Sequence, residues 1–230
     1  VAMGKMGAGE LNYSSDIDLI VFLEDQDLSI PDAMELRRHA VKVTRRAMAV
    51  LHDTTELGFV FRTDLRLRPD PSVTPVCVGT RAAMAYYQTL GRTWERAAFI
   101  KARVCAGAMG AGHAFLQDLS PFIWRKFLDF TAIREAHDLR LKIRAQRARP
   151  AQIELAGHDV KLVRGGIREI EFFTQTRQLI AGGRDPALRD NRTLPGLAAL
   201  NQAGWIEDSV RTDLCDAYRA LRHTEHALQM

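Results

Sequence analysis

Apolar and polar positions follow two different patterns along the chain. Before Thr80, strand and helix patterns are mixed. A continuous apolar run at Leu19–Glu24 predicts a short strand that is covered on both faces. Residues 33–53 carry apolar side chains at helical spacing after Pro31-Asp32, which predicts a helix. Residues 58–69 alternate between apolar and polar side chains, which predicts one longer strand before a short strand around Cys77.

From Thr80 onward the pattern is helical. We expect helices at 80–91, 93–107, 113–130 with an interruption at Pro121, 129–150, 167–183, 193–204 and 208–230, and a short strand with a glycine turn at 159–166. The change in pattern near Phe127 predicts an α+β fold with two domains. Residues 1–126 would hold a small mixed sheet, and residues 127–230 would be all-helical.

Composition narrows the class of protein. The chain has 230 residues, of which 47% are hydrophobic and 26% charged, as in an ordinary globular protein. The three cysteines are widely spaced and form no CxxC pair, which favours reduced thiols and a cytoplasmic location. We see no membrane-length apolar run and no signal peptide, so no membrane association is expected. Because the chain opens at Val1 within an apolar segment, we expect a fragment whose N-terminal part is missing.

The net charge of +4 is compatible with nucleotide phosphates, nucleic acid or an acidic protein partner. A DNA-binding face usually carries a dense basic stripe. The arginines here are spread over several helices and mostly interleaved with acids, so nucleic-acid binding is not expected.

Two carboxylates stand at the start of the first apolar run. Asp16 and Asp18 are two residues apart, so on a strand they point to the same side, about 6.5–7 Å apart. Such a pair repels itself unless a cation neutralises it, and Mg²⁺ suits oxygen ligands. The alternative is that Asp16 only caps a turn.

A third carboxylate, Asp64, lies in the alternating segment on the face that carries Arg62, Arg66 and Arg68. If the two segments pair, three acids converge, and three acids around two Mg²⁺ ions support displacement at phosphorus. The arginines would then bind phosphate oxygens. The alternative is a salt bridge between Asp64 and arginines of its own strand.

Candidate phosphate-binding groups surround these acids in the sequence. Gly7 and Gly9 precede them in a glycine-rich run, Ser15 stands directly before Asp16, and such runs turn backbone N–H groups toward phosphate or simply form a loop. Lys101 and Arg103 fall on the helix expected at 93–107, where they either face phosphate or coat a solvated surface.

The segments "GKMGAGELNYSSDIDLI", "DLRLRPDPSVTP", "YYQTLGRTWERAAFIKARV" and "GGIREIEFFTQTRQLIAGG" resemble, in this order, the family of bifunctional glutamine synthetase adenylyltransferase/adenylyl-removing enzymes. That family belongs to the DNA polymerase beta-like nucleotidyltransferase superfamily. The resemblance implies that Asp16, Asp18 and Asp64 bind metal, and that the segment 160–183 folds back on the site, with Arg168 or Glu169 contributing to catalysis. The superfamily's usual Gly-Ser pair is replaced by Gly9-Glu10, which leaves a serine contact to phosphate at that place in doubt.

The resemblance is strongest to the half that removes AMP from glutamine synthetase, with phosphate as the attacking group and ADP as product. It implies glutamine synthetase as the substrate protein, a PII-type signal protein as regulator, two Mg²⁺ ions, and ATP or ADP as nucleotide. Three alternatives stay open: the homologous adenylylating half, a nucleotidyltransferase with another substrate, and a non-catalytic nucleotide-binding module.

Overall fold

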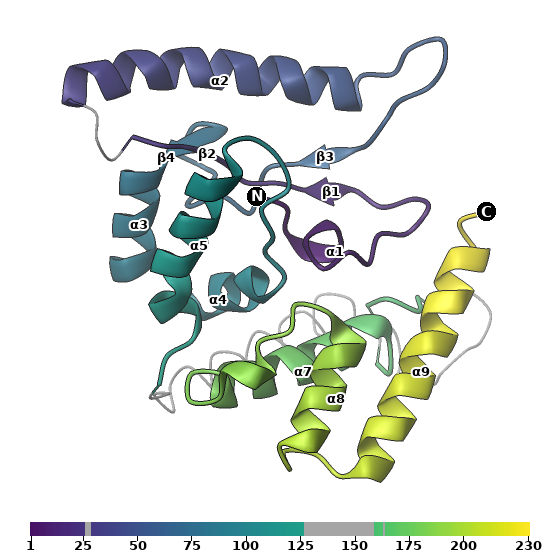
Figure 1. Ribbon diagram of the computed structural model, residues 1–230. Helices are drawn as coiled ribbons and strands as arrows, with labels where there is room; N and C mark the ends of the chain where they lie inside the picture. The colour runs from purple at the N-terminus through teal and green to yellow at the C-terminus, as the bar shows by residue number, and fades with distance from the viewer. Residues whose placement is uncertain (26–28, 127–158, 163) are drawn as a thin grey trace. The chain divides into compact units, whose positions relative to one another are not determined.

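The computed structural model describes residues 1–25, 29–126, 159–162 and 164–230 (Figure 1). The chain divides into two compact units, Val1–Ile123 and Trp124–Met230. The fold is α+β and rich in helices, as the sequence predicts. The helix expected at 129–150 lies outside the described residues, and the functional identities assigned to the two predicted domains stay a prediction.

The strands of the first unit are short and pair in parallel. β1 (Ile17–Asp18) pairs with β3 (Thr63–Asp64), and β2 (Val21–Leu23) pairs with β4 (Cys77–Gly79). Ala2 adds antiparallel bridges to Leu19 and to Arg103, so the strand arrangement is mixed, as expected. The short strand predicted around Cys77 is confirmed.

The long strand predicted at 58–69 is wrong, because only Thr63–Asp64 joins a sheet. The preceding residues wrap around the end of α2 (Ile30–His52), where the amides of Val60 and Phe61 donate to the carbonyl of Leu51. Their hydrogen bonds therefore go to a helix end rather than to a neighbouring strand. Side-chain alternation predicts a strand but carries no information about this contact with the end of α2.

Helices flank the strands of the first unit on two sides (Figure 1). α2 begins after Ser29, whose side chain accepts from the amide of Asp32, and it lies on one side. On the other side lie three helices, α3 (Thr80–Thr89), α4 (Thr93–Ile100) and α5 (Met109–Ile123). The helix predicted at 113–130 is not interrupted at Pro121, because this proline lies within α5, near its end.

The helix predicted at 93–107 is too long. α4 ends at Ile100, and Lys101 caps it. Beyond the cap, Arg103 exchanges two backbone hydrogen bonds with Ala2, 2.9 Å from the Arg103 amide to the Ala2 carbonyl and 2.8 Å in the other direction. The backbone groups of Arg103, which the helical pattern predicts to bond within the helix, bond instead to Ala2.

The second unit is a group of helices around one apolar core. α7 (Ile167–Ala181), α8 (Thr193–Gln202) and α9 (Asp208–Ala227) pack on one another, with a short 3₁₀ turn at Pro186–Leu188. The core is lined by buried side chains that include Ile167, Leu188, Leu197, Leu200 and Tyr218.

The strand predicted at 159–166 is wrong for its described residues. They form turns, in which the carbonyls of Val160 and Lys161 accept from the amides of Ile167 and Arg168 at the start of α7. The glycine turn itself is present, and Gly165 has a φ of 78°, a backbone conformation that favours glycine.

Candidate functional site: a carboxylate cluster beside a glycine turn

The single helical turn α1 (Gly4–Gly7) lies directly against the first strand, and we call it the glycine turn of the site. The amide of Met3 donates to the carbonyl of Asp18 at 2.9 Å. Gly4 has a φ of 51°, and a Cβ at Gly4 would lie 2.5 Å from Oδ2 of Asp18. Glycine is therefore required at Gly4 for two reasons, and the result is a carboxylate held against the backbone of the turn.

The third predicted acid joins the first two through strand pairing. Asp18 and Asp64 are register partners in the parallel pair β1–β3. In-register residues of neighbouring strands lie about 4.8 Å apart and share a face of the sheet. The condition set by the sequence, that the segment of Asp64 pairs beside the segment of Asp18, is therefore met.

Two of the carboxylates are paired with arginines. Nε of Arg62 lies 2.6 Å from Oδ1 of Asp16, and Nη2 of Arg62 donates to Oγ of Ser14 at 3.1 Å. Nη2 of Arg66 lies 2.6 Å from Oδ2 of Asp64, and the amide of Arg66 donates to Oδ1 at 2.8 Å. The alternative in which Asp64 pairs with an arginine of its own segment is thus the arrangement observed.

The charges of this cluster act on one another. Hydrogen bonds from Arg66 hold the pKa of Asp64 below its usual value. In turn, Asp64 raises the pKa of Arg66, and the charges of Asp18 and Asp16 add to that effect. The charges of all three aspartates thus favour the positive charge of Arg66, and Asp64 is the one that contacts it.

The donor set suits a hard divalent cation, although the side chains are not arranged around one. Among the described residues, no group of three histidine, cysteine, aspartate or glutamate side chains is placed to hold a metal ion. Asp16 and Asp64 are instead each paired with an arginine, Arg62 and Arg66. The side chain of Arg66 is 82% exposed, so it can leave Asp64 without disturbing the core.

Lys101 and Arg103 hold the glycine turn from its other side. Nζ of Lys101 lies 3.0 Å from Oε2 of Glu10, and the two side chains are only 7% and 15% exposed. Arg103 donates from Nε to the carbonyl of Gly7 at 3.1 Å and from Nη2 to that of Met6 at 2.9 Å. Both cations are thus engaged with the turn, and their predicted contact with phosphate stays a prediction.

The turn is closely fitted to its neighbours. A Cβ at Gly7 would overlap the backbone oxygen of Lys101. The amides of Gly7 and Gly9 already donate to the carbonyls of Met3 and Met6, at 2.9 and 3.2 Å. Ser15 accepts from the amide of Asn12 at 3.4 Å. Phosphate binding by the amides of Gly7 and Gly9 would therefore have to compete with these internal bonds.

In the second unit, Glu169 closes the turn that precedes α7. Its Oε2 accepts from the amide of Gly165 at 3.0 Å. The amides of Ile167 and Arg168 are taken by the carbonyls of the preceding turn. The first backbone amides of α7 are therefore already hydrogen-bonded within the chain. A catalytic role of Glu169 stays a prediction.

Two residues of this site were not singled out from the sequence. Arg62 was noted only as one of several charges beside Asp64, and Glu10 only as a departure from a motif. The partner of each lies far along the chain, at Asp16 for Arg62 and at Lys101 for Glu10. The alternation that put Arg62 on the face of Asp64 was a usable signal, whereas no local pattern pointed to the pairing of Glu10.

With this geometry described, comparison with known proteins decides the family. The profile of the family described as glutamate-ammonia ligase adenylyltransferase matches residues 1–118. The chain belongs to this family. It is 54% identical over 230 residues to the bifunctional glutamine synthetase adenylyltransferase/adenylyl-removing enzyme of Bradyrhizobium sp. strain BTAi1. The same-named proteins of Mesorhizobium japonicum and Rhizobium meliloti are 51% and 50% identical.

These comparisons cover the whole chain but only 23% of each relative. A second profile, described as PII-uridylyltransferase, matches residues 137–230. The family resemblance seen in the sequence motifs is thereby confirmed. Among the residues that the structure describes, no helix is long and apolar enough to cross a membrane.

Proposed function

We propose that this chain carries a nucleotidyl-transfer site that removes AMP from adenylylated glutamine synthetase by phosphorolysis. The observation that carries the proposal is the in-register pairing of Asp18 with Asp64, with the Asp18 carboxylate held against Gly4 of the glycine turn. Inorganic phosphate would attack the phosphorus of the AMP group. The bond from phosphorus to the tyrosine oxygen would break, giving ADP and the free tyrosine.

Asp16, Asp18 and Asp64 would hold Mg²⁺, which when bound supplies positive charge that stabilises the transition state and lowers the pKa of an attacking group. The arginines beside the acids would have two roles. Arg62 and Arg66 neutralise the acids in the absence of the cation. Once released, their planar guanidinium groups are suited to bind phosphate oxygens through two hydrogen bonds each.

The proposed protein substrate follows from the name of the relatives, which are glutamine synthetase adenylyltransferase/adenylyl-removing enzymes. A PII-type signal protein as regulator is supported only by the description of the profile that matches residues 137–230. ATP or ADP as nucleotide follows from the same family chemistry.

The direct test incubates the chain with adenylylated glutamine synthetase, Mg²⁺ and inorganic phosphate. The expected result is ADP in an amount equal to the tyrosine that is freed. Replacing phosphate with sulfate should abolish ADP formation while leaving the proteins intact. Absence of ADP under all conditions would exclude this activity.

A second candidate is the reverse modification, in which AMP is transferred from ATP to unmodified glutamine synthetase. The relatives are named for both activities, and the acid cluster suits both directions. Release of pyrophosphate from ATP and unmodified glutamine synthetase, without ADP formation from the adenylylated protein, would favour it. Binding of ADP or ATP with no turnover in either assay would indicate a non-catalytic module.

A further inference from the structure

The ion pair between Lys101 and Glu10 joins two segments that lie 91 residues apart in the chain. Nζ of Lys101 lies 3.0 Å from Oε2 of Glu10, and the two side chains are 7% and 15% exposed. Taking two charges out of water is costly, and a buried pair often returns little of that cost as stability. Such a pair can instead specify one arrangement of the segments that it joins.

One of the two joined segments is the glycine turn. Glu10 follows this turn, and its amide donates to the carbonyl of Lys5 at 2.8 Å. Gly9, directly before it, has a φ of 68°, which lets the chain reverse its direction here. Lys101 is the residue that caps the end of α4. The ion pair therefore fastens the outgoing end of the glycine turn to the end of α4.

The segment after α4 contacts the same turn in further places. A Cβ at Gly7 would overlap the backbone oxygen of Lys101, so the two backbones are in close contact. The side chain of Arg103 donates to the carbonyls of Gly7 and Met6. Its backbone exchanges hydrogen bonds with Ala2, shortly before the turn. The side chains and the backbone of this segment thus all act on the position of the turn.

The position of the turn in its own right limits that of Asp18. A Cβ at Gly4 would lie 2.5 Å from Oδ2 of Asp18, so this carboxylate rests on the first residue of the turn. The amide of Met3 donates to the carbonyl of Asp18 at 2.9 Å, and Ala2 forms a bridge to Leu19. A shift of the turn would therefore change the space that is open to the Asp18 carboxylate.

We propose that Lys101 and Glu10 are positioning residues, whose buried ion pair holds the glycine turn against Asp18 and so keeps this carboxylate in place beside Asp64. This inference rests on the proposed function. Lys101 then acts through the turn and does not bind phosphate itself. To reach Lys101, a phosphate would have to displace a buried partner, whereas the 82% exposed side chain of Arg66 can move without that cost.

The test compares Glu10→Gln, Lys101→Met and the double variant in the full chain, with adenylylated glutamine synthetase, Mg²⁺ and phosphate. Each single variant should lower kcat at least about 10-fold, because a misplaced carboxylate loses its geometry toward the reacting group. The KM for phosphate should stay within about twofold of the wild-type value. The double variant should lose no more than the more affected single variant, since both substitutions remove the same contact.

Direct binding of phosphate by Lys101 would give a different pattern. Lys101→Met alone would then raise the KM for phosphate, whereas Glu10→Gln would leave the lysine in place to bind it. That outcome would overturn the positioning role, and so would a wild-type kcat in the folded double variant. Folding is checked by circular dichroism and thermal unfolding. The double variant decides the question where a single variant does not fold, because it leaves no buried charge without its partner.

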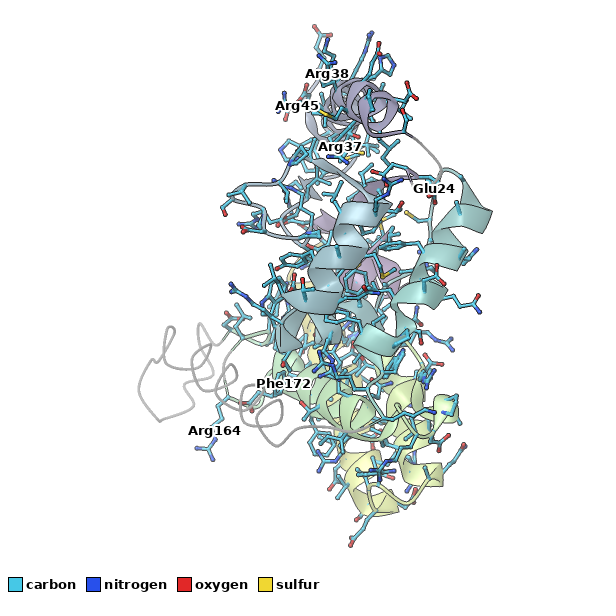
Figure 2. All side chains as sticks on the ribbon, turned by 90° about the vertical axis from the view of Figure 1, so that its left-hand side faces the viewer. Glu24, Arg37, Arg38, Arg45, Arg164 and Phe172 are labelled. Carbon is cyan, nitrogen blue, oxygen red and sulfur yellow. The ribbon has the colours of Figure 1, made fainter. Side chains whose placement is uncertain are left out.

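Asp25→Asn is the matched control, because it removes the charge of another buried acid of the first unit. Nη2 of Arg37 lies 3.1 Å from Oδ2 of Asp25, and Arg37 points from α2 toward the rest of the unit (Figure 2). Its further partners, Thr80 and Arg81, belong to α3. The control should therefore lose stability while kcat stays within about twofold of the wild type. An equal loss of kcat in the control would overturn the specific role of the ion pair.

A measurement without turnover separates this inference from the proposed function. Protection of the Gly9 and Glu10 amides from hydrogen exchange should fall at least about 10-fold in Glu10→Gln and Lys101→Met, but not in the control. The carboxyl carbon resonance of Asp18 should shift in the same two variants. If these changes occur while the wild type forms no ADP, the proposed function fails and the positioning role stands. If the wild type forms ADP and neither change occurs, the positioning role is wrong and the proposed function stands.

Discussion

The two ends of the stretch from Asp16 to Asp25 use aspartate in opposite ways. At the start, Asp16 is exposed and binds the side chain of Arg62, which is itself 45% exposed. At the end, Asp25 is 2% exposed. It accepts from the amide of Arg81 at 3.0 Å, from Oγ1 of Thr80 at 3.2 Å and from Nη2 of Arg37 at 3.1 Å.

The difference lies in whether the partners can be exchanged. Burial by itself would raise the pKa of Asp25, but the amide of Arg81, Arg37 and Thr80 together hold it below the usual value. A Cβ at Gly79 would overlap its Oδ2, so the packing leaves no room for a ligand. An acid with fixed donors on every side is structural, whereas an acid paired with an exposed arginine is available for a cation or a phosphate.

The largest effect on activity should come from removing the charge of Asp18, near the exposed end of the stretch. Asp18→Asn keeps the shape of the side chain but weakens the acid cluster, so ADP formation should fall by at least about 100-fold. The melting temperature should stay close to that of the wild type. Activity within about threefold of wild type would remove Asp18 from the site and break the comparison.

At the buried end the effect should fall on stability. Asp25→Ala leaves the buried amide of Arg81 without its acceptor and Arg37 without its ion-pair partner, so the free energy of unfolding should drop by about 2–4 kcal/mol. Urea denaturation measures this change. Asp25→Asn, which keeps one acceptor oxygen, should lose less, and an equal loss in both would contradict the hydrogen-bond explanation.

A pH series should separate the two ends by their sensitivity to salt. Asp25 and Asp64 both have a folded pKa below the unfolded value of about 3.9. The stability that they contribute is therefore present above that pH and is lost as pH falls through the folded pKa. Because Asp64 is paired with an exposed arginine, its share should shrink in high salt. The share of buried Asp25 should not.

This prediction is checked by urea unfolding between pH 5 and pH 3 at low and high salt. Asp25→Asn should flatten the loss of stability at both salt concentrations, whereas Asp64→Asn should flatten it only at low salt. The same salt dependence for the two variants would show that burial does not distinguish the two ends.

The smallest structural effect is expected at Arg62. Arg62→Gln removes an ion pair whose two side chains are 45% and 55% exposed, so the melting temperature should stay within experimental error. The KM for phosphate should rise by a few-fold, since the guanidinium is lost near the acids. A rise in melting temperature would instead mean that Arg62 is held in a strained position for function.

Much of the architecture followed from local pattern. The helix over α2 and the helix over α7 were expected from periodicity and lie within a few residues of their predicted limits. The pair of aspartates was found from the sequence, which allowed but did not require the strand pairing that brings Asp64 beside Asp18. These features depend on residues close to one another in the sequence, or on side chains that share one face of a short segment.

Tertiary structure alone decided which partner each charged group takes. The end of α4 depends on a bridge to Ala2, the pairing of Lys101 depends on Glu10, and the segment before Asp64 follows the end of α2 instead of a strand. Backbone and ionic groups have many acceptable partners at similar cost, so a choice among distant ones is made by packing. The sequence indicated a site made of aspartates and a glycine-rich turn. The fold decided that Arg62 pairs with Asp16 and Arg66 with Asp64, whereas Asp18 lies against Gly4.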